Sequence, residues 1–445
     1  MLERAVRADF SKKCGRIKPL NGISLGPLFE LESSLDLTGS YRELGVPFVR
    51  TSVASPGRHS DFNVDIARIF PDPELDERFP ESYDFRELDR QLMSIRESGA
   101  AILLSIGESS VRYAPFAAHP FVSAEKWARI AEKLILHLNR GWGGGHKLSV
   151  KMLEIWPGAD IPGAFSGGAP AYFEFYRTVA IHLKSAFPTL KIGAYSSGGF
   201  TSLNRYGATD EERGYIDFLE DFLGRVSDKS SGAPLDFFSW RCHAESAEEL
   251  AIHTNYARNF LAQYGLRKTA SIISELVLEP QDGIAATSRS YPALLAAAFS
   301  AASETDISMM IYATGFPYSP VNGLYTVDEG KELHKYSSYG VMAAYGELLA
   351  HGTEVETTDN FRREIYSIAA VSERGGALMI ATVGYAGMLS IELAGSSFTK
   401  YSIKGILGGG LRGEGFSTSE SDIPIGSGRF TMKVGRGEVY LITLA

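Results

Sequence analysis

The chain has 445 residues, with 44 Lys or Arg against 53 Asp or Glu, so its formal net charge is −9. Its 44% hydrophobic and 22% charged residues are typical of a folded globular protein and exclude global disorder. An acidic chain without a basic stripe is a poor binder of a phosphate backbone, and no apolar run reaches about 18 residues, so we expect neither nucleic acid nor membrane as a partner.

The N-terminal sequence MLERAVRADFSKKCGRIK lacks the apolar core of a secretory signal. Cys14 and Cys242 are the only cysteines, too few for a disulfide framework or a Cys-based zinc site. These features predict a soluble protein of the cytoplasm.

The first three-quarters of the chain contain eight short apolar runs that we interpret as strands: Ile17–Gly26, Pro47–Val53, Ala101–Ile106, Lys151–Trp156, Lys191–Ser196, Leu235–Arg241, Ala270–Leu276 and Ser308–Ala313. Several of them, such as AILLSI and SMMIYA, are apolar almost throughout. Continuous apolar strands are typical of a parallel sheet that helices cover on both sides.

Segments with helical spacing lie between these runs. Leu88, Leu92 and Ile95 share one face of the first segment, and a similar stripe begins at Trp127 in the next. Five further helices are predicted at Tyr172–Ala186, Asp210–Val226, Ala247–Tyr264, Arg289–Ser303 and Glu332–Ala350. Eight strands alternating with helices predict a (β/α)8, or TIM, barrel over residues 1–350. An open doubly wound sheet would need a glycine-rich phosphate loop after an early strand, and the sequence has none there.

After residue 350 the pattern changes to short β-type runs separated by Gly, Ser and Asp: Tyr366–Val371, Ala377–Val383, Met388–Glu392, Phe398–Lys404, Phe430–Val434 and Glu438–Thr443. Such spacing predicts an antiparallel β-sandwich over residues 351–445. We interpret the tract LGGGLRGEGFSTSESD as a loop within it, and we expect the two domains to pack together.

In a (β/α)8 barrel the functional side chains lie at the C-terminal ends of the strands. The predicted strand ends carry carboxylates, aromatic rings and hydrogen-bonding groups: Glu108, Trp156, Gly158, Asp160, Trp240, Arg241, His243, Glu275 and Tyr312. Sugars offer hydroxyl groups to polar side chains and flat C–H faces to rings, so this collection predicts a carbohydrate site.

Two of the carboxylates differ in their setting. Glu275 stands where the apolar run ASIIS emerges, and it fits either a functional group or an ion pair with a neighbouring Arg. Glu154 lies between Leu153 and Ile155 within a strand, which is more typical of a satisfied structural group.

Other chemistries find little support. The His residues show no H-E-x-x-H or similar spacing, so we expect neither a metal nor a cofactor. No G-x-S-x-G elbow follows a strand, and Cys242 and His243 point to opposite faces of theirs.

Several segments, in order along the chain, resemble glycoside hydrolase family 39, the group containing β-xylosidases and α-L-iduronidases. They are Asp65–Ala100, Lys126–Trp142, Met152–Phe200, Asp236–Trp240, Ser274-Glu275 and NGLYT near Asn322. The resemblance covers most of residues 20–350 and implies a (β/α)8 barrel with a β-sandwich.

The resemblance also implies roles for single residues. The family's nucleophile matches Glu275. Its Trp-Asn-Glu-Pro motif, whose Glu is the general acid/base, matches Trp156-Pro157-Gly158-Ala159, so this chain has Gly158 in place of that Glu. Arg50-Thr51-Ser52 stands for Arg-Thr-His, and Arg241 stands where a His is frequent.

Two functions follow from this pattern. The first is a retaining glycosidase that acts on an oligo- or polysaccharide with Glu275 as nucleophile and with Asp160 or Glu108 as a substitute acid, although Asp160 also fits a turn residue. The second is a catalytically silent carbohydrate-binding protein, in which Gly158 enlarges the pocket. In either case the substrate-binding candidates are Trp156, Gly158, Phe165, Trp240, Arg241, His243 and Tyr312, and each aromatic ring among them also fits ordinary core. A structural or assembly role is a third interpretation.

Overall fold

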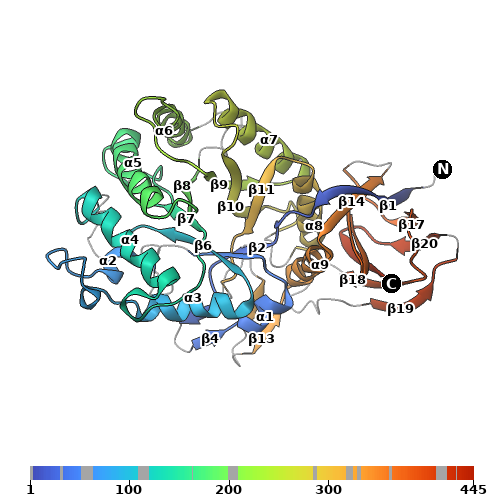
Figure 1. The fold of residues 1–445 in the computed structure, drawn as a ribbon. Helices are drawn as coiled ribbons and strands as arrows, with labels where there is room; N and C mark the ends of the chain where they lie inside the picture. The colour runs from blue at the N-terminus through green and yellow to red at the C-terminus, as the bar shows by residue number, and fades with distance from the viewer. Residues whose placement is uncertain are drawn as a thin grey trace.

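The computed structural model describes residues 4–30, 34–51, 64–108, 120–162, 164–198, 209–283, 288–316, 324–327, 332–359, 363–406, 418–426 and 428–445. Two parts lie side by side in it, a helix-covered barrel and a curled sheet (Figure 1).

The barrel is closed by eight strands in the order β10-β11-β2-β5-β6-β7-β8-β9, and all neighbouring pairs are parallel. Their bounds are β2 Gly22–Ser24, β5 Phe48–Arg50, β6 Ala101–Ile106, β7 Met152–Ile155, β8 Lys191–Ser197, β9 Phe237–Ala244, β10 Ala270–Leu278 and β11 Ile307–Tyr312. Each of them overlaps one of the eight predicted runs. The predicted (β/α)8 barrel is therefore confirmed.

The described helices are α1 Thr38–Glu43, α2 Ile66–Ile69, α3 Arg86–Ser98, α4 Ala124–Arg140, α5 Gly168–Ala186, α6 Asp210–Val226, α7 Ala247–Gln263, α8 Tyr291–Ser303 and α9 Ser337–His351, with 3-10 turns η1 Pro80–Ser82 and η2 Trp142–Gly144. Helix α4 shows how the sequence sets such bounds. The Ser123 side chain accepts a hydrogen bond from the Lys126 amide at its start, and Gly141 ends it in a left-handed conformation.

Two short hairpins complete this part, β3 Leu28–Glu30 with β4 Ser34–Asp36 and β12 Tyr325–Val327 with β13 Leu333–Lys335. The second corrects the sequence analysis. The helix predicted from Glu332 begins at Ser337, because residues 333–335 pair with β12 instead.

The second part is a nine-stranded sheet in the order β19-β18-β21-β16-β15-β14-β1-β17-β20. Its strands are β1 Ala5–Arg16, β14 Thr353–Asp359, β15 Tyr366–Ser372, β16 Gly375–Thr382, β17 Gly387–Ala394, β18 Lys400–Ile406, β19 Thr418–Pro424, β20 Arg429–Val434 and β21 Glu438–Leu444. All neighbours are antiparallel except β1 and β17, so the predicted C-terminal antiparallel β structure is confirmed.

Three strands of this sheet, β1, β14 and β19, were not predicted. Residues 418–422 belong to the tract interpreted as a loop, yet they begin β19, while residues 407–417 lie outside the described residues. Strand β19 is polar and pairs only with β18 at the edge of the sheet, so it carries no apolar signal.

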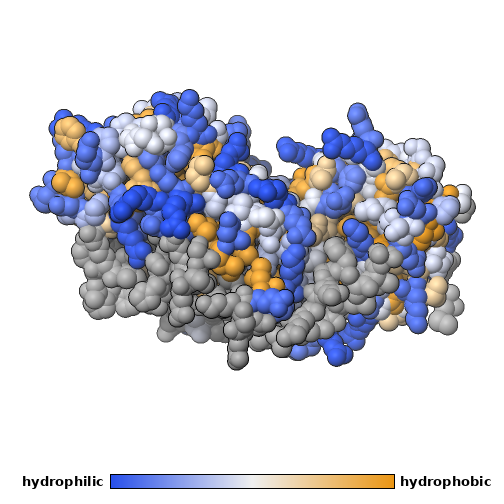
Figure 2. All heavy atoms as spheres, turned by 90° about the horizontal axis from the view of Figure 1, so that it is seen from below, coloured by the Kyte–Doolittle hydropathy of each residue, from blue (hydrophilic) through white to orange (hydrophobic). Residues whose placement is uncertain are grey.

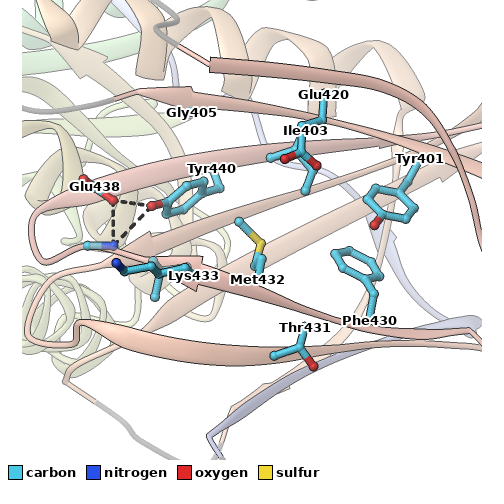
Figure 3. A pocket seen from close by; sticks show the side chains of 12 residues that line it. Tyr401, Ile403, Gly405, Glu420, Phe430, Thr431, Met432, Lys433, Glu438 and Tyr440 are labelled. Carbon is cyan, nitrogen blue, oxygen red and sulfur yellow. Dashed lines mark hydrogen bonds between the residues drawn. The ribbon is translucent and has the colours of Figure 1, made fainter.

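The sheet curls until its two ends approach each other. The Tyr401 ring on β18 stacks on the Phe430 ring on β20, with centroids 4.1 Å apart and planes 9° apart. Between these strands lies a groove of about 530 Å³, whose far end is bordered by Glu438 and Tyr440 (Figure 3). This closure gives the sheet the sandwich-like form expected.

One face of the sheet packs on helices α8 and α9, as expected from the sequence. The Ser300 hydroxyl on α8 donates a hydrogen bond to the Ser367 carbonyl on β15. Ile368, Met379 and Leu441 from the sheet share one continuous core with the barrel helices. The barrel and the sheet therefore stabilise each other, although the division at residue 350 stays a prediction.

On the face drawn in Figure 2, hydrophilic residues dominate the described surface and hydrophobic residues form small, separate patches. Within the described part of the chain, no helix has both the length and the apolar character needed to cross a membrane.

Candidate active site

Glu275 lies on β10, where the pairing with β9 shifts register between Ile273 and Glu275 and places Glu275 beside Arg241. Its side chain is 27% exposed. One carboxylate oxygen accepts a hydrogen bond from Arg50 Nη1 at 3.2 Å, and the other lies 3.5 Å from Arg241 Nε. Both interpretations offered by the sequence, an accessible carboxylate and an ion-paired one, therefore apply to the same group.

The two arginines decide the charge of Glu275. Burial by itself raises the pKa of this carboxyl, but the positive charges of Arg241 and Arg50 outweigh it and hold the pKa below its ordinary value. Glu275 is therefore an anion at neutral pH, the form that a nucleophile requires.

Arg50 is itself held by a fully buried network behind the site. Its Nε and Nη2 donate to Glu154 Oε2 at 3.1 and 2.6 Å, and the Ser105 hydroxyl donates to the same oxygen at 2.6 Å. Arg50 and Glu154 have no exposed surface. Glu154 is thus closed to solvent and holds Arg50 through Oε2, while its Oε1 has no hydrogen-bond partner among the described residues. Arg50 was not among the candidate site residues, although two signals pointed to it: its place at the end of an apolar strand and its match to the Arg of the family's Arg-Thr-His motif.

Gly158 and Arg241 fit together at the end of β7. Gly158 has φ +73°, and a Cβ built on it would lie 2.7 Å from Ile161 Cδ1 and 3.2 Å from Arg241 Nη2. A side chain at this position would therefore need both neighbours to move. Positions 158 and 241, at which the resemblance expects other residues, therefore lie against each other.

Asp160 ties the loop after β7 to the end of β8. One of its oxygens accepts hydrogen bonds from the Ser197 hydroxyl and the Gly198 amide, both at 2.8 Å, and the other is buried with no hydrogen-bond partner among the described residues. Burial raises the pKa of Asp160 to about 6 despite these hydrogen bonds. The side chain can therefore carry a proton close to neutral pH, but only 7% of the residue is exposed.

Glu108 and His243 lie on either side of this centre. The Glu108 carboxylate accepts hydrogen bonds from Trp127 Nε1 at 3.0 Å and from the Phe121 amide, so it holds the segment that leads into α4. His243 lies on β9, with Nδ1 3.2 Å from the Glu279 carboxylate, and its positive form would add to the field on Glu275.

The four predicted stacking rings, Trp156, Phe165, Trp240 and Tyr312, are buried in the barrel. Trp156 has φ +56°, donates its indole N–H to the Ala164 carbonyl and packs edge-on against Phe165. Trp240 donates to the Ser271 hydroxyl, and the Tyr312 hydroxyl meets that of Tyr291 at 3.1 Å. The alternation of side chains along a strand does not predict the burial of Trp156, because the left-handed turn at this residue redirects its side chain. These rings act as core in the described structure.

The structure thus gathers Glu275, Arg50, Arg241, Gly158 and His243 at one end of the barrel, with Asp160 buried in the loop after β7. Ser52, at the predicted end of the second strand, lies outside the described residues.

No family model matches the sequence, and no curated protein matches it either. Among solved structures, a glucosidase from Croceicoccus marinus superposes with a TM-score of 0.80 at 19% identity, covering 100% of this chain and 99% of that one. A GH39 β-xylosidase from Caulobacter crescentus gives 0.69 at 14% identity, with 99% of both chains covered. A GH51 α-L-arabinofuranosidase from Thermotoga petrophila RKU-1 gives 0.67 at 13%, with 100% of both covered. Over its whole length, this chain therefore has the barrel-and-sheet fold seen in these glycosidases.

Proposed function

We propose that this protein is a glycosidase-like enzyme that cleaves a glycosidic bond of an oligo- or polysaccharide, with Glu275 as its nucleophile. The observation that carries the proposal is the partly exposed, ionised Glu275 at the mouth of the barrel, held between Arg50 and Arg241. In a retaining mechanism such a carboxylate attacks the sugar and forms a covalent glycosyl-enzyme intermediate. The buried Arg50–Glu154 pair keeps it oriented for that attack.

The proton donor is the second part of the mechanism. Asp160 is the stronger candidate, because its pKa of about 6 lets it hold a proton near neutral pH and because one of its oxygens has no partner among the described residues. Glu108 is the weaker candidate, since its carboxylate already accepts hydrogen bonds from Trp127 and Phe121. Asp160 has to become more exposed before it can reach a leaving group.

One observation favours the alternative, a carbohydrate-binding protein that does not hydrolyse its ligand. The Arg241 guanidinium lies against Gly158, the position at which the resemblance places the acid/base, and it also pairs with Glu275. That arrangement stabilises the Glu275 anion, and a carboxyl at position 158 would require the Arg241 and Ile161 side chains to move. In either function the partner is a carbohydrate, and a cytoplasmic location stays a prediction.

Hydrolysis of a panel of aryl glycosides tests the proposal. We expect Glu275→Gln to lower the rate by about 10³-fold or more, as the loss of a nucleophile does. The matched control is Glu279→Gln, on the same chain segment beside His243, which should stay close to the wild-type rate. Equal activity in wild type and Glu275→Gln would eliminate Glu275 as the nucleophile.

The dependence of the rate on the leaving group shows whether a general acid is in place. Without a positioned acid, activated aryl glycosides should react far faster than natural oligosaccharides, and azide, which needs no general base, should accelerate turnover of the intermediate. If natural linkages are instead cleaved at ordinary rates without azide, Asp160→Asn should slow them by about 10²- to 10⁴-fold and leave aryl substrates nearly unaffected. A sugar that binds without reacting would establish the binding function, and neither binding nor reaction would contradict both.

A further inference from the structure

Asp89, His137 and His146 converge on one point on the outside of the barrel, away from Glu275. Their ligand atoms all lie within 4.8 Å of one another. His137 Nε2 is 2.9 Å and His146 Nε2 is 3.3 Å from the same oxygen, Asp89 Oδ1. Within the described ranges, no other set of three His, Cys, Asp or Glu side chains meets in this way.

The backbone brings these side chains together from three elements. Asp89 lies in the first turn of α3 and His137 in the last turn of α4. His146 returns to α4 through the run Gly141–Gly145, in which Gly143 and Gly144 have φ +61° and +78°, and its amide donates to the His137 carbonyl at 2.7 Å. A Cβ at Gly145 would collide with the His137 carbonyl and lie 2.6 Å from its Nδ1, so this approach requires glycine.

In the neutral form of His137, the Nε2 atom has no hydrogen-bond donor opposite it among the described residues. Nδ1 lies 2.8 Å from the Trp142 carbonyl, which can only accept, so Nδ1 carries the hydrogen. In the neutral ring Nε2 then presents a lone pair to the Asp89 carboxylate, which also has only lone pairs to offer. The Phe85 ring, stacked on His137 with centroids 3.7 Å apart, blocks one face of the imidazole.

The second imidazole, that of His146, also has a nitrogen without a hydrogen-bond partner in the described part of the chain. Its Nε2 is buried and makes no hydrogen bond within the described structure, although Asp89 Oδ1 is only 3.3 Å away. Two imidazole nitrogens and a carboxylate oxygen that converge on one another form a ligand set that is typical of a zinc site.

We propose that Asp89, His137 and His146 bind a divalent transition-metal ion of the Zn²⁺ class, with a fourth position open. At Zn–N distances of about 2.0–2.1 Å, tetrahedral ligands lie roughly 3.3 Å apart, close to the 2.9 and 3.3 Å that separate the two imidazole nitrogens from Asp89 Oδ1. The Trp142 carbonyl fixes the ring of His137, as outer partners of zinc-bound His commonly do. A groove of about 510 Å³, bordered by Asp89, His137 and Tyr83, lies beside these ligand groups and is the side from which we expect water or a small ligand to approach the ion. The bound ion would tie α3 to α4.

The test is a titration of the full-length, chelator-treated protein with Zn²⁺ alone, followed by calorimetry and by the thermal unfolding midpoint. We expect one ion per chain and a raised midpoint. His146→Gln should weaken Zn²⁺ binding by more than about 100-fold, since even outer partners of metal ligands are worth about 10- to 100-fold. The matched control is His182→Gln: His182 forms a comparable pair with Glu132, at 2.6 Å, without a third ligand group in the described structure. It should bind Zn²⁺ as the wild type does.

Circular dichroism of each variant before titration establishes that it is folded. Should His146→Gln fail to fold, Asp89→Asn keeps the shape of the site, replaces the carboxylate by a neutral amide and should lose the ion in the same way. A wild type that takes up no Zn²⁺, or equal uptake by the His146 and His182 variants, overturns the proposal. The cluster would then be a buried imidazolium–carboxylate pair, which ¹⁵N NMR would show as a doubly protonated His137. None of these readouts depends on hydrolysis, so they are independent of the proposed function.

Discussion

Arg50 links the buried part of the candidate site to the part that is open to solvent. It is fully buried and pairs with two carboxylates, one of them Glu154, which is closed to solvent, and the other Glu275, which is partly open. Removing one partner from a buried ion pair typically costs about 3–5 kcal/mol, because the remaining charge stays buried without compensation. The Glu154 side of the network therefore fixes the guanidinium, and the Glu275 side is left to meet a ligand.

Asp160 predicts a pH dependence of stability at the residue scale. Its folded pKa of about 6 lies above the value of about 3.9 in an unfolded chain, so the folded state binds the proton more tightly. The contribution of Asp160 to the free energy of unfolding should therefore be fully present below about pH 4 and be lost between about pH 4 and 6, up to about 3 kcal/mol. Urea denaturation at a series of pH values measures the slope. Asp160→Asn has no proton to lose and should therefore show a different slope in this window, without the decline assigned to Asp160; identical slopes would contradict the burial argument.

At the scale of an element, the loop after β7 depends on Gly158. Its φ of +73° and its contacts with Ile161 and Arg241 impose two separate costs on any other residue. We expect Gly158→Ala to lower the free energy of unfolding by about 1–2 kcal/mol for the left-handed backbone and by a further 1–3 kcal/mol or so for overpacking.

Gly265 provides the matched control, because it has φ +76° and no atom lies within 4 Å of the position that a Cβ would take there. Gly265→Ala should lose stability through the backbone cost alone. Equal losses for the two variants in urea denaturation would show that Arg241 and Ile161 yield easily, and that position 158 can accept a side chain.

At the scale of the whole molecule, β1 connects the two ends of the chain. It lies between β14 and β17 inside the sheet, so the first strand of the sequence completes the C-terminal part. Phe10 on β1 is buried and packs edge-on against Phe398, with ring centroids 5.2 Å apart. We expect Phe10→Ala to cost about 3–5 kcal/mol, as for other buried aromatic side chains.

Arg7 on the same strand is the control, because its side chain is 49% exposed and its ion pairs are long, 3.4 Å to the buried Asp9 and 3.8 Å to the partly exposed Glu392. Asp9 keeps its hydrogen bonds from Ser11 when Arg7 is removed. Arg7→Ala should change stability by less than about 1 kcal/mol. Denaturant unfolding of both variants distinguishes an interior strand from a peripheral one: similar small losses would place β1 outside the core of the sheet.

The sequence by itself determined the barrel. The period of its apolar runs is a local property, and strands such as Ala101–Ile106 are apolar on both sides because helices cover one face and the interior of the barrel takes the other. The same patterns located the main helices, most strands of the C-terminal sheet and the emergence of Glu275 from a buried strand.

Only the tertiary structure decided which distant residues meet. β19 finds its place through backbone pairing, which leaves no apolar signature in its polar sequence. β1 alternates Val6, Ala8 and Phe10 with polar residues, but that short pattern does not show that the strand pairs with β14 and β17 of the C-terminal sheet. Trp156 is part of the core because its left-handed backbone conformation redirects the side chain. Arg241 lies against Gly158 because β7 and β9 are both neighbours of β8 in the closed barrel. Asp89, His137 and His146 show no metal-binding spacing along the chain, since helix packing and a glycine loop bring their ligand atoms together. Periodicity reports which face of an element is buried, whereas a site depends on the distances between elements, and those are set only when the barrel closes.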